Sequence, residues 1–304
     1  MRCLALAQAW QDMGGAVTFC CASLPAALAS RLAAEGVAVR MIDVDPGTSA
    51  DAGDVIRLAG EIAASAVVVD GYVFDADYQR RLKAAGLRLL FIDDNVHAEQ
   101  YDADFVLNQN AYADSLTYPL ASETRLLLGT PYTLLRREFL ANRSPEREIP
   151  VSAGKVLVTL GGSDPQNVTM SVIEALSGLP FETTVIVGAS NPHRDVLQRA
   201  AGELGIRVEV SVTDMPHWMN WAELAVTAAG STCWETAHMG LPGIALVIAD
   251  NQQRIGTWLE SQRLAVVLNQ DVTPVHLRQA LVDLAGDSDL RRMMSLNGQA
   301  TIDG

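Results

Sequence analysis

Short apolar runs alternate with helix-forming segments along nearly the whole chain, and this alternation limits the folds that the chain can adopt. The clearest run, Val67-Val68-Val69, is β-branched without interruption, which is typical of a strand buried on both faces. Strands that alternate with helices pair in parallel, and their helices cover both faces of the sheet. The chain is therefore predicted to be α/β, with doubly wound parallel sheets.

A polar segment, Ser144–Pro150, is punctuated by proline and predicts a linker. A chain of 304 residues is long enough for two domains with separate cores. We therefore expect domains over 1–146 and 147–304. Strands are expected at 16–20, 37–42, 66–70, 89–92, 105–107, 125–128, 156–160, 184–187, 208–210, 224–227 and 243–247, and helices at 4–13, 25–35, 55–65, 76–85, 168–176, 195–204, 274–284 and 287–294.

The chain is acidic, with a net charge of −14 and a pI near 4.7. Non-specific binding to nucleic acid needs a basic surface, so nucleic acid is not an expected partner. A phosphate group would have to be held by backbone amides and helix ends rather than by a lysine-rich patch. No apolar run reaches membrane-spanning length and no signal peptide is recognisable, so we expect a cytoplasmic protein without membrane contact.

No metal site and no cofactor are expected. The four cysteines form no C-x-x-C pair, and the five histidines show no ligand-type spacing. We interpret the cysteines as reduced, mostly buried small hydrophobic residues.

Two small-residue turns follow predicted strands in the second half. Gly161-Gly162-Ser163 precedes a helix that Ser163 or Asn167 could cap, and Gly230-Ser231-Thr232 opens another helix. Glycine allows a ligand to approach the backbone closely, and a helix N-terminus favours phosphate. Glu235, one turn into the second helix, could accept protons from ribose hydroxyls. The alternatives are a turn that only reverses the chain and a capping box formed by Thr232 and Glu235.

Polar residues end the predicted strands of the first half. The carboxyl ends of strands are where a doubly wound sheet builds its binding site. For two aspartates, Asp93 and Asp94, we favour capping of a turn. The candidates are Asp70, Tyr72, Asp93, Asp94, Asn108 and Asn110.

Several motifs together resemble one enzyme family. They are Met1-Arg2-Cys3-Leu4-Ala5-Leu6-Ala7, Asp70-Gly71-Tyr72, Ile92-Asp93-Asp94, Leu107-Asn108-Gln109-Asn110-Ala111-Tyr112, Leu128-Gly129, Tyr132-Thr133-Leu134-Leu135-Arg136-Arg137-Glu138-Phe139, Leu160-Gly161-Gly162-Ser163-Asp164, Gly230-Ser231-Thr232, Glu235 and Asn251-Gln252. In combination, and over nearly the whole chain, they are similar to the UDP-2,4-diacetamido-2,4,6-trideoxy-β-L-altropyranose hydrolases of pseudaminic acid biosynthesis. Spore-coat polysaccharide proteins share the pattern, as does, more distantly, the glycosyltransferase that makes lipid II.

The resemblance implies a GT-B fold, with two Rossmann-like domains and a UDP-sugar in the cleft between them. In the second domain it implies Glu235 on the ribose and Ser231-Thr232 on the diphosphate, with the two glycine turns completing the UDP site. The implied reaction is attack of water at the anomeric carbon with UDP leaving, which needs a base and stabilisation of the diphosphate. The residues implied on the sugar side are Arg2, Tyr72, Asn108, Asn110, Asn251 and Gln252. The oligomeric state stays open.

The start of the chain departs from the family pattern. If Arg2 ends the family's G-x-G-H-x-x-R motif, its catalytic histidine and first strand would precede Met1, so we assign no catalytic residue. We then expect the first sheet to lack a central strand, to expose an apolar edge, and to support little hydrolysis. A UDP-sugar glycosyltransferase and a nucleotide-sugar-binding module without turnover are the alternatives.

Overall fold

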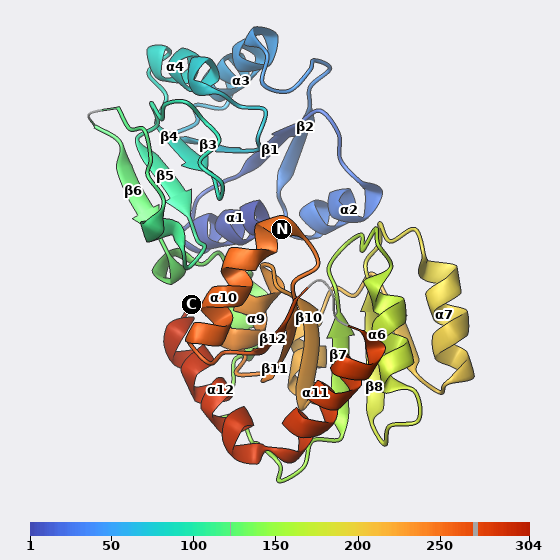
Figure 1. The fold of residues 1–304 in the computed structure, drawn as a ribbon. Helices are drawn as coiled ribbons and strands as arrows, with labels where there is room; N and C mark the ends of the chain where they lie inside the picture. The colour runs from blue at the N-terminus through green and yellow to red at the C-terminus, as the bar shows by residue number, and fades with distance from the viewer. Residues whose placement is uncertain (122, 270–272) are drawn as a thin grey trace. The chain divides into compact units, whose positions relative to one another are not determined.

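Two separately packed units, Met1–Arg137 and Glu138–Gly304, make up the fold (Figure 1). The computed structural model describes residues 1–121, 123–269 and 273–304. The boundary expected after residue 146 lies inside the second unit. The predicted α/β class with parallel sheets is confirmed, because every strand pair in the described sheets is parallel.

The first unit alternates helices and short strands, as the apolar pattern predicts. Its elements are α1 (Arg2–Asp12), β1 (Thr18–Cys21), α2 (Ala26–Ala34), β2 (Ala38–Met41), α3 (Ser49–Glu61), β3 (Val67–Asp70), α4 (Ala76–Ala84), β4 (Leu89–Ile92), β5 (Phe105–Asn108), η1 (Ala113–Ser115), β6 (Arg125–Leu128) and η2 (Thr130–Tyr132).

The strands of the first unit fall into two separate sheets. One holds β1 and β2, and the other has the order β3-β4-β5-β6. Two hydrophobic clusters go with the two sheets: one around α1, α2 and β1–β2, the other around α3, α4 and the larger sheet.

The expectation that β3 is buried on both faces was wrong. Val69 is buried, but the side chain of Val68 is 44% exposed. The sequence pattern is that of a central strand, whereas β3 has a hydrogen-bonded neighbour, β4, on one side only. The side chain of Val68 is therefore exposed to solvent, because no packed layer in the described part of the chain covers that face of β3.

The second unit holds one continuous sheet of order β12-β11-β10-β7-β8-β9. Its first strand, β7, lies at the centre, and β7 and β10 are almost entirely buried. The elements are α5 (Arg137–Asn142, which starts at the boundary), β7 (Lys155–Thr159), α6 (Val168–Leu176), β8 (Glu182–Val187), α7 (Arg194–Glu203), β9 (Arg207–Val210), α8 (Met215–Trp221), β10 (Leu224–Ala228), α9 (Thr232–His238), β11 (Gly243–Leu246), η3 (Asp250–Gln252), α10 (Gln253–Ser261), β12 (Val266–Leu268), α11 (Pro274–Gly286) and α12 (Ser288–Thr301).

Two hydrophobic clusters cover the two faces of this sheet. Side chains of β7 enter both of them, because successive residues of a strand point to opposite faces. Val156 and Val158 belong to the larger cluster, and Leu157 belongs to the smaller one. Among the described residues, no helix is long and apolar enough to cross a membrane.

Candidate functional site

Two turns emerge side by side at the carboxyl edge of the second unit's sheet. β7 and β10 are paired neighbours, with Thr159 opposite Thr227 near their ends. The turn after β7 begins at Gly161, whose φ of +91° favours glycine, and this turn is exposed. The adjacent strands therefore bring together the two small-residue turns that the sequence analysis singled out.

The turn after β7 is already capped from within the chain. The buried Asp164 carboxylate accepts hydrogen bonds from the backbone N–H groups of Val168 and Thr169, both at 2.9 Å, and from the Thr169 hydroxyl. The expectation that Ser163 or Asn167 caps this helix was wrong, because Asn167 adopts a left-handed conformation and makes no side-chain cap. The N-terminus of α6 is thus occupied by a carboxylate.

The turn after β10 is organised differently. Its N-cap residue, Ser231, makes no side-chain cap hydrogen bond, and Thr232 is already the first helical residue, so Thr232 is not the N-cap of a capping box. Within the described part of the chain, no backbone hydrogen bond is donated by the amides of Ser231 and Thr232. Glu235 lies in the first turn of α9 and is half-buried. Two amides and a carboxylate therefore lie close together in sequence at the carboxyl end of a central strand.

A buried thiol lies beneath this second turn. Cys233 Sγ donates to the carbonyl oxygen of Ala228 at 3.2 Å and lies 3.5 Å from the Thr227 hydroxyl. Burial raises the pKa of this thiol to about 11, so it stays protonated near neutral pH. The thiol therefore ties the start of α9 to the end of β10.

Asn251 and Gln252 lie in η3, after β11, the next strand of the same sheet. Asn251 is exposed, and the Gln252 side-chain oxygen accepts a hydrogen bond from the Ile248 amide at 3.0 Å. The oxygen of Gln252 thus shapes its own loop, and its amide nitrogen is the group that is left to contact a ligand.

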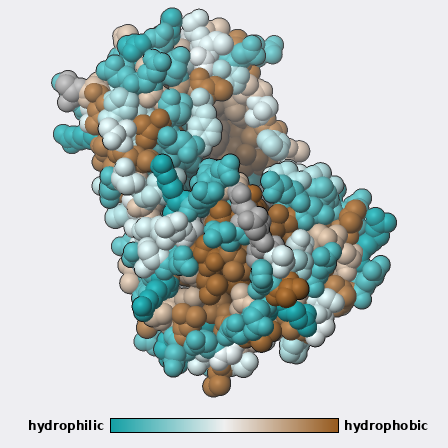
Figure 2. All heavy atoms as spheres, viewed as in Figure 1, coloured by the Kyte–Doolittle hydropathy of each residue, from teal (hydrophilic) through white to brown (hydrophobic). Residues whose placement is uncertain are grey.

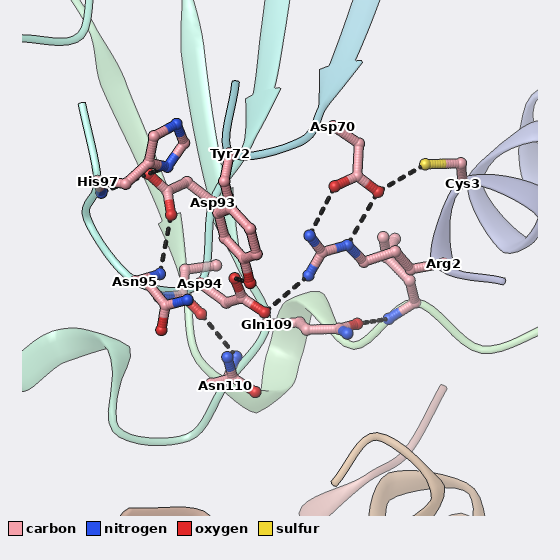
Figure 3. Close-up of polar contacts among 12 residues, drawn as sticks. Arg2, Cys3, Asp70, Tyr72, Asp93, Asp94, Asn95, His97, Gln109 and Asn110 are labelled. Carbon is pink, nitrogen blue, oxygen red and sulfur yellow. Dashed lines mark hydrogen bonds and ion pairs between the residues drawn. The ribbon is translucent and has the colours of Figure 1, made fainter. Parts of the chain in front are cut away.

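In the first unit, an arginine joins three segments of the chain (Figure 3). The Arg2 guanidinium donates to both carboxylate oxygens of Asp70, at 2.6 and 3.0 Å, and to Asp94 at 3.0 Å. Cys3 Sγ donates to Asp70 at 2.9 Å, and the hydroxyl of the exposed Tyr72 donates to Asp94 at 2.6 Å. The start of α1 is thereby held against the carboxyl ends of β3 and β4.

The charges of this cluster stabilise one another. Burial alone would raise the pKa of Asp70, but the hydrogen bonds and charge of Arg2 hold it below its usual range. Burial and the Asp94 carboxylate both raise the pKa of Tyr72. Tyr72 therefore stays a neutral phenol, and its exposed ring is held in place through its hydroxyl.

Asp93 behaves as the predicted turn cap. Its carboxylate is fully buried and accepts hydrogen bonds from the amides of Asn95, Val96 and His97 and from the Tyr101 hydroxyl. Asp94, for which we favoured the same role, instead binds Arg2 and Tyr72. Of the two neighbouring carboxylates, Asp93 therefore stabilises its own turn, whereas Asp94 lies beside the exposed Tyr72.

Asn108 and Asn110 are buried and form hydrogen bonds within their own part of the first unit. Both are buried, at 1% and 6% exposure. The Asn108 side chain donates to the Tyr118 hydroxyl and accepts from the Asn110 amide. Their visible role is to hold the loop after β5. In the described ranges, no group of three or more His, Cys, Asp or Glu side chains is arranged to hold a metal ion.

Comparison with known proteins finds a family match within the second unit. Residues 156–302 match the family model of the glycosyltransferase family 28 C-terminal domain. This range contains both turns, Glu235 and the Asn251-Gln252 loop.

Three curated relatives extend the likeness into the first unit. An uncharacterized protein of Methanocaldococcus jannaschii is 24% identical over 211 residues, 64% of this chain and 43% of that protein. The spore coat polysaccharide biosynthesis protein SpsG of Bacillus subtilis is 26% identical over 225 residues, 71% of this chain and 65% of that protein. The UDP-N-acetylglucosamine–N-acetylmuramyl-(pentapeptide) pyrophosphoryl-undecaprenol N-acetylglucosamine transferase of Salinibacter ruber is 28% identical over 258 residues, 79% of this chain and 68% of that protein. The chain thus spans less than two thirds of the first two.

Solved structures confirm the fold. MurG of Acinetobacter baumannii matches with a TM-score of 0.63 at 16% identity, over 98% of this chain and 90% of that one. Anabaena HepE in complex with UDP matches with a TM-score of 0.64 at 14% identity, over 99% and 90%. The chain has the GT-B fold, with two Rossmann-like units.

Proposed function

We propose that the second unit binds UDP and that the chain acts on a UDP-linked sugar. The observation that carries the proposal is the glycosyltransferase family 28 match over the range whose sheet edge presents the two turns. In this proposal the Ser231 and Thr232 amides bind the diphosphate, Glu235 accepts the ribose hydroxyls, and Gly161-Gly162-Ser163 lets the ligand approach β7. A relative that carries UDP-N-acetylglucosamine in its name supports a UDP-amino sugar as donor.

We propose glycosyl transfer as the reaction. In such a step the bond between the anomeric carbon and the diphosphate breaks, an acceptor oxygen attacks the carbon, and UDP departs with the electron pair. The transferase named among the relatives supports transfer over hydrolysis. Asn251 and Gln252 are the side chains of the second unit that we propose for the sugar.

Hydrolysis, in which water is the acceptor, is the second candidate. It is favoured by the Arg2–Asp70–Tyr72–Asp94 cluster, because these residues belong to the motifs that resemble the pseudaminic acid pathway hydrolases. Arg2 and Tyr72 already donate to Asp94, so this carboxylate is less available as a base than an unpaired one.

One assay separates the two reactions. Release of UDP from UDP-N-acetylglucosamine is followed with and without the N-acetylmuramyl-(pentapeptide) pyrophosphoryl lipid named for the relative. Transfer predicts release that depends on the lipid, whereas hydrolysis predicts equal release and free sugar in the NMR spectrum. A chain that binds UDP but releases none under either condition would be a binding module.

The UDP site itself is tested by calorimetry on Glu235→Ala. Loss of a hydrogen bond between a carboxylate and a ribose hydroxyl is expected to weaken UDP binding by about 1–3 kcal/mol. Glu260→Ala, an exposed carboxylate on α10, is the matched control and is expected to bind UDP like the unchanged chain. Equal affinity of the two variants would remove Glu235 from the site.

A further inference from the structure

In the second unit, the loop after β8 (residues 188–193) packs against the glycine turn after β7. The two strands are paired neighbours, with Thr159 opposite Ile186 near their ends. A Cβ added to Gly188, the first residue of the loop, would lie 2.5 Å from the Cα of Gly162 and would overlap the Gly162 carbonyl oxygen. The backbones of the loop and of the turn therefore come closer here than any residue with a side chain would allow.

Two side chains of this loop donate hydrogen bonds to backbone carbonyl oxygens in and just after the glycine turn. The Ser190 hydroxyl donates to the Gly162 carbonyl oxygen at 2.8 Å. His193 Nε2 lies 3.1 Å from the Pro165 carbonyl oxygen, and the ring nitrogen is the donor because a carbonyl oxygen only accepts. The loop after β8 therefore holds the turn at two of its carbonyl groups.

The loop that provides these donors is braced by hydrogen bonds of its own. The Asn191 amide donates to the Gly188 carbonyl oxygen at 3.1 Å, and the Asn191 side-chain oxygen accepts from the His193 amide at 2.8 Å. Asn191 is buried, whereas the neighbouring Ser190 is exposed. The Ser190 hydroxyl therefore extends from a fixed backbone, although its side chain lies at the surface.

The hydrogen bond from Ser190 sets the orientation of the peptide group between Gly162 and Ser163. The described residues contain no cis peptide bond, and in a trans peptide the C=O and N–H groups point in opposite directions. Since the Gly162 carbonyl points at Ser190, the Ser163 N–H points away from the loop after β8. Ser163 is exposed, and within the described part of the chain its amide donates no hydrogen bond.

The side of the turn away from β8 is the side of β10. In the sheet, β8 and β10 lie on opposite sides of β7 (Figure 1). The turn after β10 carries the Ser231 and Thr232 amides, which also donate no backbone hydrogen bond in the described ranges. Figure 2 shows a largely hydrophilic surface where Figure 1 draws the loops after β7 and β8. The Ser163 amide is therefore directed toward the two amides to which the proposed function assigns the diphosphate.

We propose that Ser190 is a positioning residue for the diphosphate, because it turns the Ser163 amide toward the ligand as a third donor. This inference rests on the proposed binding of UDP by the second unit. A phosphate group bound by backbone amides needs several N–H groups directed at one point. Without the Ser190 hydroxyl, the Gly162 carbonyl loses its partner, and the peptide group can rotate because glycine adopts many backbone conformations. Ser190 thus acts through Ser163 and does not itself contact the ligand.

Binding of UDP and of uridine, measured by calorimetry and by NMR titration, tests this role. Ser190→Ala is expected to weaken UDP binding by about three- to tenfold and to leave uridine binding unchanged, because only the diphosphate loses a donor. Ser190→Thr keeps the hydroxyl and is expected to bind UDP like the unchanged chain. Ser261→Ala is the matched control, because the exposed Ser261 hydroxyl also donates to a backbone carbonyl at 2.8 Å, that of Trp258. Unchanged UDP binding by Ser190→Ala, or an equal loss for uridine, would overturn the proposal.

The amide proton signal of Ser163 gives a second test, which a loss of stability would not mimic. In the unchanged chain this signal is expected to move downfield when UDP binds, because the amide gains a hydrogen bond. In Ser190→Ala saturated with UDP, the shift is expected to be lost while the Ser231 and Thr232 signals still move. A Ser163 signal that stays in place in the unchanged chain, or that moves equally in both proteins, would contradict the role of Ser190. Failure of the unchanged chain to bind UDP would reject the proposed function, and this inference with it.

Discussion

The two units differ in what joins the halves of their sheets. In the second unit, β7 supplies backbone hydrogen bonds to β8 and β10 and side chains to both cores. In the first unit, β1 and β3 share no ladder, and Arg2 links the start of α1 to Asp70 and Asp94. Continuous apolar packing is cooperative, whereas an ion cluster acts at one point. We therefore expect the first unit to open locally at lower free energy than the second.

The largest effect on stability should come from shortening a side chain of the central strand. Leu157→Ala in β7 removes a fully buried side chain and is expected to lower the free energy of unfolding of the second unit by about 2–5 kcal/mol. Val68→Ala in β3, where the side chain is 44% exposed, should change the free energy of unfolding of the first unit by about 0.5 kcal/mol or less. Urea unfolding followed by tryptophan fluorescence and by hydrogen exchange measures both. Similar losses would show that the two strands are equally central.

Removal of the ion cluster should have an intermediate effect. Arg2→Met keeps most of the side-chain volume but leaves Asp70 and Asp94 without their shared cation, and we expect a loss of about 1–3 kcal/mol in the first unit. Hydrogen exchange of peptides covering β3 and β4 reports the change. Arg57→Met breaks two exposed ion pairs on α3, with Asp54 and Glu61, and is the control, with no measurable loss of stability expected.

The smallest effect should be a dependence of the first unit on pH. Burial alone would raise the pKa of Asp93, but hydrogen bonds from Tyr101, Asn95 and His97 lower it below the usual value. An aspartate with a lowered native pKa contributes stability above its unfolded pKa of about 3.9 and loses it as the pH falls through the native value. The stability difference between the unchanged chain and Asp93→Asn should therefore shrink below about pH 4. A constant difference from pH 7 to pH 2 would contradict this account.

Helices and strands could be predicted where the local sequence pattern determines them. The strand 89–92 and the helix 168–176 have the expected bounds, because each is a buried apolar segment flanked by polar residues. Helix α10 and strand β12 were not predicted, since Gln253 and its neighbours were taken as a polar loop. Packing against the sheet stabilises α10, and a short window of sequence does not show that packing.

The residues of the candidate site could be predicted from the sequence, but the contacts between them could not. The glycine turns and Glu235 follow from strand ends, and Asp70, Tyr72 and Asp94 were candidates for the same reason. The Arg2–Asp94 ion pair joins residues 92 positions apart, which no local pattern indicates. Asp164 was missed as the cap of α6, although an aspartate four residues before Val168 was a usable signal.

The Arg2 cluster also affects the timing of assembly during synthesis. Its partners are made 68 and 92 residues after Arg2 itself. At about 5–20 residues per second, the ribosome needs about 5 to 20 s to deliver Asp94. During that interval the apolar face of α1, with Leu4, Ala5 and Ala7, has no tether to the larger sheet. α1 is thus secured to the larger sheet only after Asp94 has been made, and slower translation between Arg2 and Asp94 should increase the binding of chaperones to its apolar face.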